Sequence, residues 1–186
     1  MLELQFTPFP QLETKRLLLR KMQPADAKAL FFLRSDETVM QYIDKERAAT
    51  INDASIFIQN ILSWINTNQS INWAITVKEN PDQLIGSIGY WRILKEHYRA
   101  EIGYMLHPDY WKKGLMKEAI QAVLDYGFQE MNLHSVEAHI NPANNGSAAI
   151  LESTGFVREA YFKEDYFFRG KFLDTAIYSR LNQEGK

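Results

Sequence analysis

The residues Trp111, Lys112, Lys113 and Gly114 form a short basic turn in the middle of the chain. Two ammonium groups attract an anion, and a glycine lets the atoms of a ligand approach the backbone closely. If a helix begins at this turn, its first backbone N–H groups are unpaired and carry partial positive charge. Such a junction is suited to bind a phosphate or pyrophosphate.

The elements on both sides of the turn are a strand and a helix. Residues 100–106 alternate like a strand, and Pro108 interrupts the alternation because proline cannot donate to a ladder. From about Gly114 the apolar period changes to that of an amphipathic helix. The alternative interpretation is an ordinary strand-to-helix connection with solvated lysines. The P-loop and the dinucleotide-binding glycine motif are both absent here.

The segment P-D-Y-W-K-K-G-L-M-K-E-A resembles the acyl-CoA pyrophosphate loop of the GCN5-related N-acetyltransferases (GNAT), whose pattern is Q/R-x-x-G-x-G/A. Trp111 stands at the Gln/Arg position, Gly114 at the central glycine and Met116 at the last Gly/Ala. Tryptophan at the first position is familiar in the RimJ/RimL-type branch, which acetylates the N-termini of ribosomal proteins. The resemblance covers about residues 10–182.

Two further blocks resemble the same family in the expected order. T-x-R-L-x-L-R, from Thr14 to Arg20, is similar to the first strand of a RimJ/RimL-type domain. Residues 144–156 resemble the N-x-x-S-…-G-F block, in which the asparagine helps to hold the pantetheine arm. Ser147 is also a candidate N-cap for a short helix over 148–153.

The resemblance implies a set of site residues. Backbone groups of the strand would meet the pantetheine amides and the oxyanion, and the loop would hold the pyrophosphate. The implied acetyl-CoA ligands are Tyr104, Met105, Leu106, Trp111, Lys112, Lys113, Gly114, Leu115, Met116, Lys117 and Asn144. No metal site is expected, since His134 and His139 are five apart on a strand and face opposite sides.

Glu101 is the candidate general base, because RimJ/RimL-type enzymes are proposed to use a carboxylate there to deprotonate the amine, through water. The alternative is a structural carboxylate paired with Arg99 or another basic group. The general acid stays open: many relatives carry a tyrosine where Leu151 stands here. The candidates are Ser147, the weaker Tyr161 and Tyr166, and water itself.

Composition excludes several other classes of protein. The net charge of −2 argues against a dedicated nucleic-acid binder, and the lack of cysteine excludes disulfides, zinc–thiolate sites and an acyl-cysteine intermediate. The N-terminus lacks the blocks of a signal peptide and no apolar run is long enough to span a membrane. We therefore expect a cytoplasmic protein without membrane contact.

The remaining segments complete an α/β (α+β) fold over one domain, residues 1–186. Helices are predicted from Pro24 to about Ser35 and over about 52–66, with a mobile, acceptor-lining linker or a surface loop between them. Strands are predicted at 12–22, 73–77, 84–90, 133–140, 159–163 and 166–181. The aromatic tail is expected to be core or a homodimer surface. The GNAT resemblance implies a mixed, mostly antiparallel sheet with helices on both faces and a splayed strand pair at the acyl-CoA site.

The sequence thus predicts an N-acetyltransferase that moves acetyl from acetyl-CoA to a primary amine, most simply a protein N-terminus. The alternatives are the same chemistry on a small amine, or a non-catalytic acyl-CoA-binding module. An acidic acceptor pocket would favour a polycation, and Asp36, Glu37, Asp44 and Glu46 are the residues that could form one.

Overall fold

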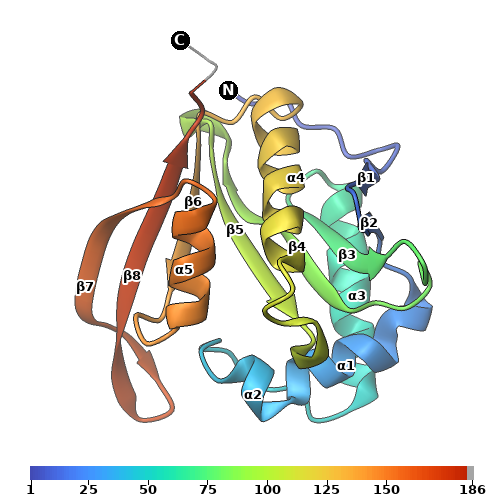
Figure 1. Cartoon of the computed structure of the whole chain (residues 1–186), viewed down its shortest axis with the longest axis horizontal. Coiled ribbons are helices and arrows are strands. Elements are labelled where there is room, and N and C mark those ends of the chain that lie inside the picture. Colours follow the sequence, from blue (N-terminus) through green and yellow to red (C-terminus); the bar gives the residue numbers. More distant parts are fainter. Residues whose placement is uncertain (184–186) are drawn as a thin grey trace.

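The structure, a computed structural model, describes residues 1–183 as one eight-stranded sheet with helices on both faces (Figure 1). The strands are β1 (Leu12–Glu13), β2 (Leu17–Lys21), β3 (Ile71–Val77), β4 (Gly86–Leu94), β5 (Arg99–Leu106), β6 (Ser135–Ile140), β7 (Val157–Phe168) and β8 (Lys171–Leu181). The helices are α1 (Ala27–Ser35), α2 (Glu37–Met40), α3 (Ile51–Asn66), α4 (Leu115–Gln129) and α5 (Asn145–Ser153). The predicted fold class is confirmed.

The elements that the sequence did not predict are short. The predicted strand 12–22 is divided into β1 and β2, which pair with each other. Helix α2 lies in the predicted linker, where Asp36 caps it by accepting the N–H groups of Thr38 and Val39. A helix of a single turn is too short to produce a periodic apolar pattern.

The sheet divides between β5 and β6. Its order is β1-β2-β3-β4-β5-β6-β8-β7, and β5–β6 is the parallel pair, as expected for strands joined through a helix. These two strands pair only at Arg99↔Ser135, Ala100↔Val136 and Glu101↔Glu137. Beyond these positions β5 stays on β4 as far as Leu106 and β6 stays on β8 as far as Ile140. We call the resulting V-shaped opening the fork.

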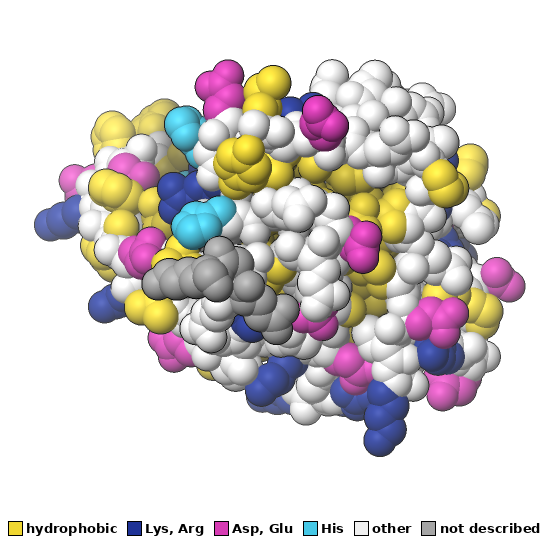
Figure 2. All heavy atoms as spheres, turned by 90° about the horizontal axis from the view of Figure 1, so that it is seen from above, with side chains coloured by type: hydrophobic (Ala, Val, Ile, Leu, Met, Phe, Trp, Pro, Cys, Tyr) yellow, Lys and Arg dark blue, Asp and Glu magenta, His cyan; other side chains and the backbone are white. Residues whose placement is uncertain are grey.

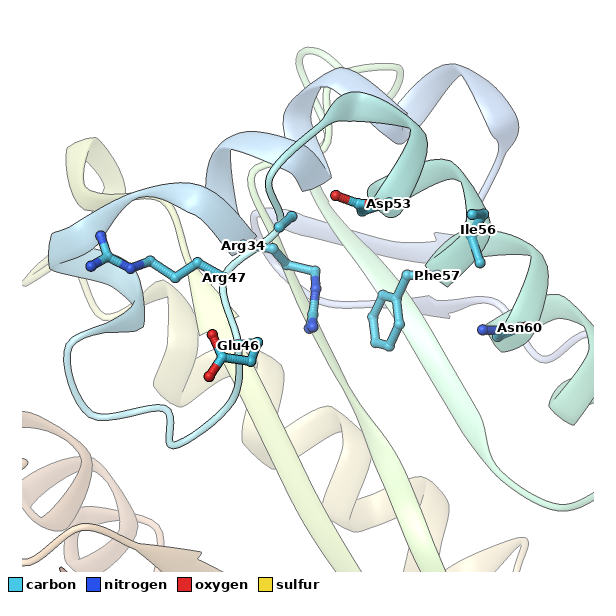
Figure 3. Close-up of a pocket in the computed structure, with 8 residues that line it drawn as sticks. Arg34, Glu46, Arg47, Asp53, Ile56, Phe57 and Asn60 are labelled. Carbon is cyan, nitrogen blue, oxygen red and sulfur yellow. The ribbon is translucent and has the colours of Figure 1, made fainter. Parts of the chain in front are cut away.

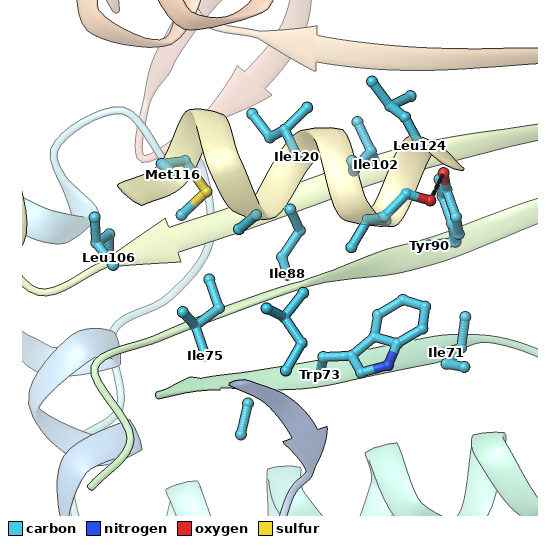
Figure 4. Close-up of a cluster of buried hydrophobic side chains, with 14 of the residues drawn as sticks. Ile71, Trp73, Ile75, Ile88, Tyr90, Ile102, Leu106, Met116, Ile120 and Leu124 are labelled. Carbon is cyan, nitrogen blue, oxygen red and sulfur yellow. Dashed lines mark hydrogen bonds between the residues drawn. The ribbon is translucent and has the colours of Figure 1, made fainter. Parts of the chain in front are cut away.

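Helix α4 packs its apolar face on β3–β5 and fixes one side of the fork (Figure 4). Ile120, Val123 and Leu124 are fully buried. The Tyr90 hydroxyl donates a hydrogen bond of 2.9 Å to the Val123 carbonyl, and a Cβ on Gly127 would collide with that hydroxyl. The close approach of helix and sheet therefore requires glycine at this position.

Helix α3 packs on the other face of the sheet. The predicted capping box is present, with Thr50 accepting from the Asp53 N–H and Asp53 accepting from the Thr50 N–H. Ala54, Ile58, Ile61 and Ile65 form its buried stripe. Helices on both faces leave the strand ends near α2 and α5 as the place where loops converge (Figure 1).

The aromatic tail forms an exposed ribbon of β7 and β8 rather than core. Tyr161, Phe162, Phe167 and Phe172 are between 48% and 65% exposed. The predicted turn at Arg169-Gly170 is present, and both residues have positive φ. Of the two expected alternatives, core is therefore wrong for Tyr161, Phe162 and Phe167, and a homodimer surface stays a prediction.

Acidic and basic side chains are interspersed on the face seen from above (Figure 2). A mixed surface of this kind agrees with the net charge of −2. Within residues 1–183, no helix combines the length and apolarity needed to cross a bilayer.

Candidate active site

The N-terminus of α4 faces the open end of the fork with its first amides outside the helical ladder. Gly114 is the N-cap, with φ of 75° and no side-chain cap. The first intrahelical bond is donated by Glu118 to the Gly114 carbonyl, so three amides precede it, those of Leu115, Met116 and Lys117. These three amides have no intrahelical acceptor, and the side chains of Leu115 and Met116 are buried in the core.

Arg16, the residue directly before β2, joins this cluster. Its guanidinium donates to the Lys113 carbonyl at 2.9 Å and pairs with Glu118 at 2.7 Å, and Glu118 also accepts from Thr14. A Cβ on Gly114 would lie 3.5 Å from Arg16 Nη2. No local sequence pattern signals a contact between residues 97 positions apart.

A hydrogen bond joins Trp111 to Leu106. The Trp111 indole N–H donates to the Leu106 carbonyl at 2.7 Å, which fastens the loop to the end of β5. One lone pair of that carbonyl is therefore occupied within the protein. Tyr104 and Met105 lie on the segment of β5 that β6 has left.

Glu101 lies at the closed end of the fork, opposite Glu137. The residue is 5% exposed. Arg92 Nη2 lies 3.0 Å from Glu101 Oε2 as an ion pair, but without hydrogen-bond geometry, so this oxygen has no hydrogen-bond partner among the described residues. Burial raises the pKa of Glu101 above its ordinary value, and Glu137 raises it further, while His139 and Arg92 lower it.

Arg92, Glu137 and His139 are site neighbours that the sequence analysis did not identify. Arg92 Nη2 donates to Glu137 Oε1 at 2.9 Å and lies 3.4 Å from His139 Nε2. Arg99 pairs with Glu137 at 3.1 Å, so the basic partner of Glu101 is Arg92 rather than Arg99. The spacing of Glu137 and His139, two apart on a strand, was the available signal for a shared face.

A β-bulge brings Arg92 to this place. Tyr90 pairs with Ile102 and Arg92 pairs with Glu101, so Trp91 is an extra residue on β4. Possible metal-ligating atoms of Glu101, Glu137 and His139 lie within 4.8 Å of one another. The Arg92 guanidinium lies among them and already supplies the positive charge, which favours an ion-pair network over a metal centre at this position.

Two hydroxyl groups, one from β5 and one from α5, meet at the fork. Tyr104 Oη and Ser147 Oγ are 2.7 Å apart, and burial raises the pKa of Tyr104 to about 12. Ser147 is not the cap of its helix: α5 begins at Asn145, and Asn144 accepts the Ser147 N–H at 3.0 Å. Both residues are types that cap helices, so their order could not be decided from sequence.

The other candidate acids lie elsewhere. Leu151 is fully buried in the core. Tyr161 donates to Asp174 on the exposed ribbon, and the Tyr166 hydroxyl donates to the Asp44 carbonyl at 3.1 Å. Neither tyrosine is brought to the fork by these contacts.

The fork connects two chemically different faces of β5. Ile102 and Leu106 pack in the core with α4, so Tyr104, two residues from each of them along the strand, is on the same α4 face. Glu101 is on the opposite face. Because the strands have separated, a group held on the α4 face can react through the opening with a group on the Glu101 face.

Known proteins resemble the chain over most of its length. A model of the acetyltransferase (GNAT) domain family matches residues 16–157. The uncharacterized N-acetyltransferase YoaA of Bacillus subtilis is 34% identical over 171 residues, which are 92% of this chain and 96% of that protein. A GNAT-family acetyltransferase from Bacillus anthracis has a similar crystal structure, with a TM-score of 0.82, 32% identity, and coverage of 92% of this chain and 98% of that one.

Two more distant relatives have named acceptors. The structure of RimL, a ribosomal L7/L12 α-N-protein acetyltransferase in complex with coenzyme A, has a TM-score of 0.84 over 92% of this chain and 98% of its own, at 18% identity. At that identity the likeness is one of fold. A spermidine N(1)-acetyltransferase from Vibrio cholerae is 24% identical over 160 residues, 86% of this chain and 90% of that protein.

Proposed function

The chain belongs to the acetyltransferase (GNAT) family and is an N-acetyltransferase, and from that premise we propose that its acceptor is the α-amino group of a protein N-terminus. GNAT acetyltransferases use acetyl-CoA as co-substrate. The reaction forms a bond between the amine nitrogen and the acetyl carbon and breaks the bond between that carbon and sulfur.

The α4 N-terminus fits the pyrophosphate of the co-substrate. The amides of residues 115–117, together with Lys112 and Lys113, supply donors and positive charge, and Arg16 adds to them. Asn144 and the open edge of β5 from Tyr104 to Leu106 are proposed to meet the pantetheine arm and the oxyanion. Backbone N–H groups fixed in a strand stabilise a developing oxyanion without reorganisation.

Glu101 is proposed to accept the proton of the amine, directly or through water. An α-amino group has a pKa of about 7.7–8.0 and a lysine one of about 10.4, so freeing a lysine at neutral pH costs about 3 kcal/mol more. A carboxylate whose pKa is raised by burial is a better base than an exposed one, and Glu101 Oε2, although ion-paired with Arg92, has no hydrogen-bond donor among the described residues. These features suit an α-amine.

Tyr104 and Ser147 are proposed to deliver the proton to the departing thiolate. With a pKa of about 12 the phenol stays protonated at neutral pH and can donate. Ser147 holds the phenol oxygen in place at 2.7 Å and can pass a proton to it. This assigns the role of general acid to a strand residue, since Leu151 cannot perform it.

The contacts of four acidic side chains favour a protein N-terminus over a polyamine as the acceptor. Asp36 caps α2, Glu37 pairs with Arg47, and Glu46 pairs with Arg169 at 2.7 Å. Three of the four carboxylates that would attract a polycation are therefore occupied within the protein. Only Asp44 has neither an ion pair nor a capping role within residues 1–183.

The test is release of CoA thiol from acetyl-CoA in the presence of matched acceptors. Peptides with free Ala, Ser or Met N-termini are compared with the same peptides blocked at the N-terminus, with spermidine and with an aminoglycoside. We expect turnover with the free peptides and none with the blocked ones. Turnover confined to the small amines would overturn the proposal and make the chain a small-amine acetyltransferase.

A further inference from the structure

A hollow of about 430 Å³ lies at the open end of the fork. Its walls are α2, the following segment 41–47, the tip of the β7–β8 hairpin and Asn141, the residue directly after β6. Two contacts hold the hairpin to the segment: the Tyr166 hydroxyl donates to the Asp44 carbonyl, and Arg169 pairs with Glu46. We call this space the mouth hollow.

The mouth hollow lies beyond the C-terminal end of β6, the strand that carries Glu137 opposite Glu101. Side chains alternate along a strand, so Glu137, His139 and Asn141 lie on one side of it. Glu137 contacts the Glu101 cluster and Asn141 lines the hollow. The four steps from Glu137 to Asn141 span about 13 Å at about 3.3 Å per residue. An extended peptide whose amine lies near Glu101 therefore carries about its fourth and fifth residues into the hollow.

The rim of the mouth hollow has an excess of positive charge. Its lining includes four cations, Lys45, Arg47, Arg169 and Lys171, but only two carboxylates, Glu37 and Asp44. Arg47 and Arg169 are paired with Glu37 and Glu46. Within residues 1–183, neither Lys45 nor Lys171 forms an ion pair. Asp44 is half-buried, and burial raises its pKa while the nearby Lys45 lowers it.

A second, smaller hollow on the other side of the same segment does not belong to this path. It lies between residues 46–48 and α3, where Arg34 points at the ring of Phe57, 4.1 Å from its centroid (Figure 3). Its lining residues come from α1, α3 and the segment between them, and none comes from β5, β6 or the hairpin. Of the two hollows, only the mouth hollow has a lining residue next to β6.

We propose that the mouth hollow binds the acceptor polypeptide at about its fourth and fifth residues and selects carboxylate side chains there, through Lys45 and Lys171. This rests on the proposed function, because the acceptor is taken to be a polypeptide long enough to reach from Glu101 to the hollow. In the proposed complex, the apolar lining residues Met40, Phe168 and Leu173 pack on the peptide backbone and on the aliphatic parts of its side chains. Lys45 and Lys171 pair with the carboxylates of the peptide.

The experiment compares three peptides that share a free N-terminus and differ only at residues 4 and 5, which are Glu-Glu, Ala-Ala or Lys-Lys. We expect kcat/KM to fall in that order, by about two- to fivefold per step, as exposed charge pairs typically give. The variant Lys45→Glu/Lys171→Glu is expected to reverse the order. Lys163→Glu, an exposed change on the same hairpin outside the hollow, is expected to preserve it.

The possible failures are distinguishable. Equal kcat/KM for the three peptides, or an order that the double variant leaves unchanged, overturns the acidic-acceptor inference and leaves N-terminal acetylation standing. Turnover of spermidine with none of any peptide overturns the proposed function itself. A Lys-Lys peptide preferred by the unmodified protein also overturns the inference, since it would require the hollow to attract cations.

Discussion

Glu101 and Glu137 face each other at the last paired position of β5 and β6, and the guanidinium of Arg92 lies 3.0 Å from the first and 2.9 Å from the second. Two carboxylates at such a position repel each other, which favours protonation of one of them. Arg92 opposes that effect, and His139 lies beside the same group. The protonation of the proposed base is therefore controlled by neighbours from two other strands.

Replacement of Glu101 by Gln tests the base directly. The change keeps the size of the side chain and removes its ability to accept a proton. We expect kcat to fall by about 10²-fold or more, as for other general bases, and the affinity for acetyl-CoA to stay within a factor of about two. Steady-state kinetics and calorimetry measure the two quantities. Loss of both together would mean that Glu101 is structural.

Two substitutions beside Glu101 should shift its pKa in opposite directions. Arg92→Gln removes a charge that lowers the pKa, so the pKa should rise; Glu137→Gln removes a charge that raises it, so the pKa should fall. Carbon-13 NMR titration of the glutamate carboxyls, assigned with Glu101→Gln, measures both. The acid limb of the pH–kcat profile should move with them. Shifts of the same sign in both variants would contradict this electrostatic assignment.

Tyr104→Phe tests the proposed acid. We expect kcat to fall about tenfold or more with a small change in KM for acetyl-CoA, since the ring is kept and only the hydroxyl is lost. Ser147→Ala should give a smaller decrease because it removes the partner and not the donor. Tyr161→Phe is the matched control on the exposed ribbon. If it lowered kcat as much as Tyr104→Phe, the assignment of Tyr104 as the general acid would be contradicted.

Gly114→Glu should weaken the binding of acetyl-CoA, raising its Kd by more than tenfold. Calorimetry measures the Kd. It adds a negative charge and a Cβ where the loop has φ of 75°. Gly170→Glu is a matched control: its φ is 79° and nothing lies within 4 Å of the added Cβ. That variant carries the same strain and charge at the hairpin turn and should bind acetyl-CoA normally. Equal losses would argue against the placement of the pyrophosphate at α4.

The ion pair between Arg20 and Asp26 should matter for stability and not for catalysis. Both side chains are almost fully buried and make two hydrogen bonds, of 2.8 and 2.7 Å. Asp26→Ala leaves a buried guanidinium without its partner, which typically costs about 3–5 kcal/mol of unfolding free energy. Urea denaturation measures the loss. The double change Arg20→Met/Asp26→Leu should recover most of it, and a double variant as unstable as the single one would contradict this explanation.

The predictable parts of the site are those that depend on local pattern. The alternation of β5 and the amphipathic face of α4 indicated their junction, and Gly114 adopts the left-handed conformation that favours glycine. The bulge at Trp91 adds one residue to β4, which a period of two cannot reveal. Arg16 and Arg92 reach the site from other strands, and such pairings depend on the register of the assembled sheet.

The fork also links the folding stability of the protein to the binding of its co-substrate. The sheet is left incomplete between β5 and β6, so a ligand seated there takes the place of a missing strand and its binding energy becomes folding energy. At a concentration 100 times Kd, such a ligand adds about 2.7 kcal/mol of stability. We therefore expect the protein to unfold at a lower urea concentration without acetyl-CoA than with it.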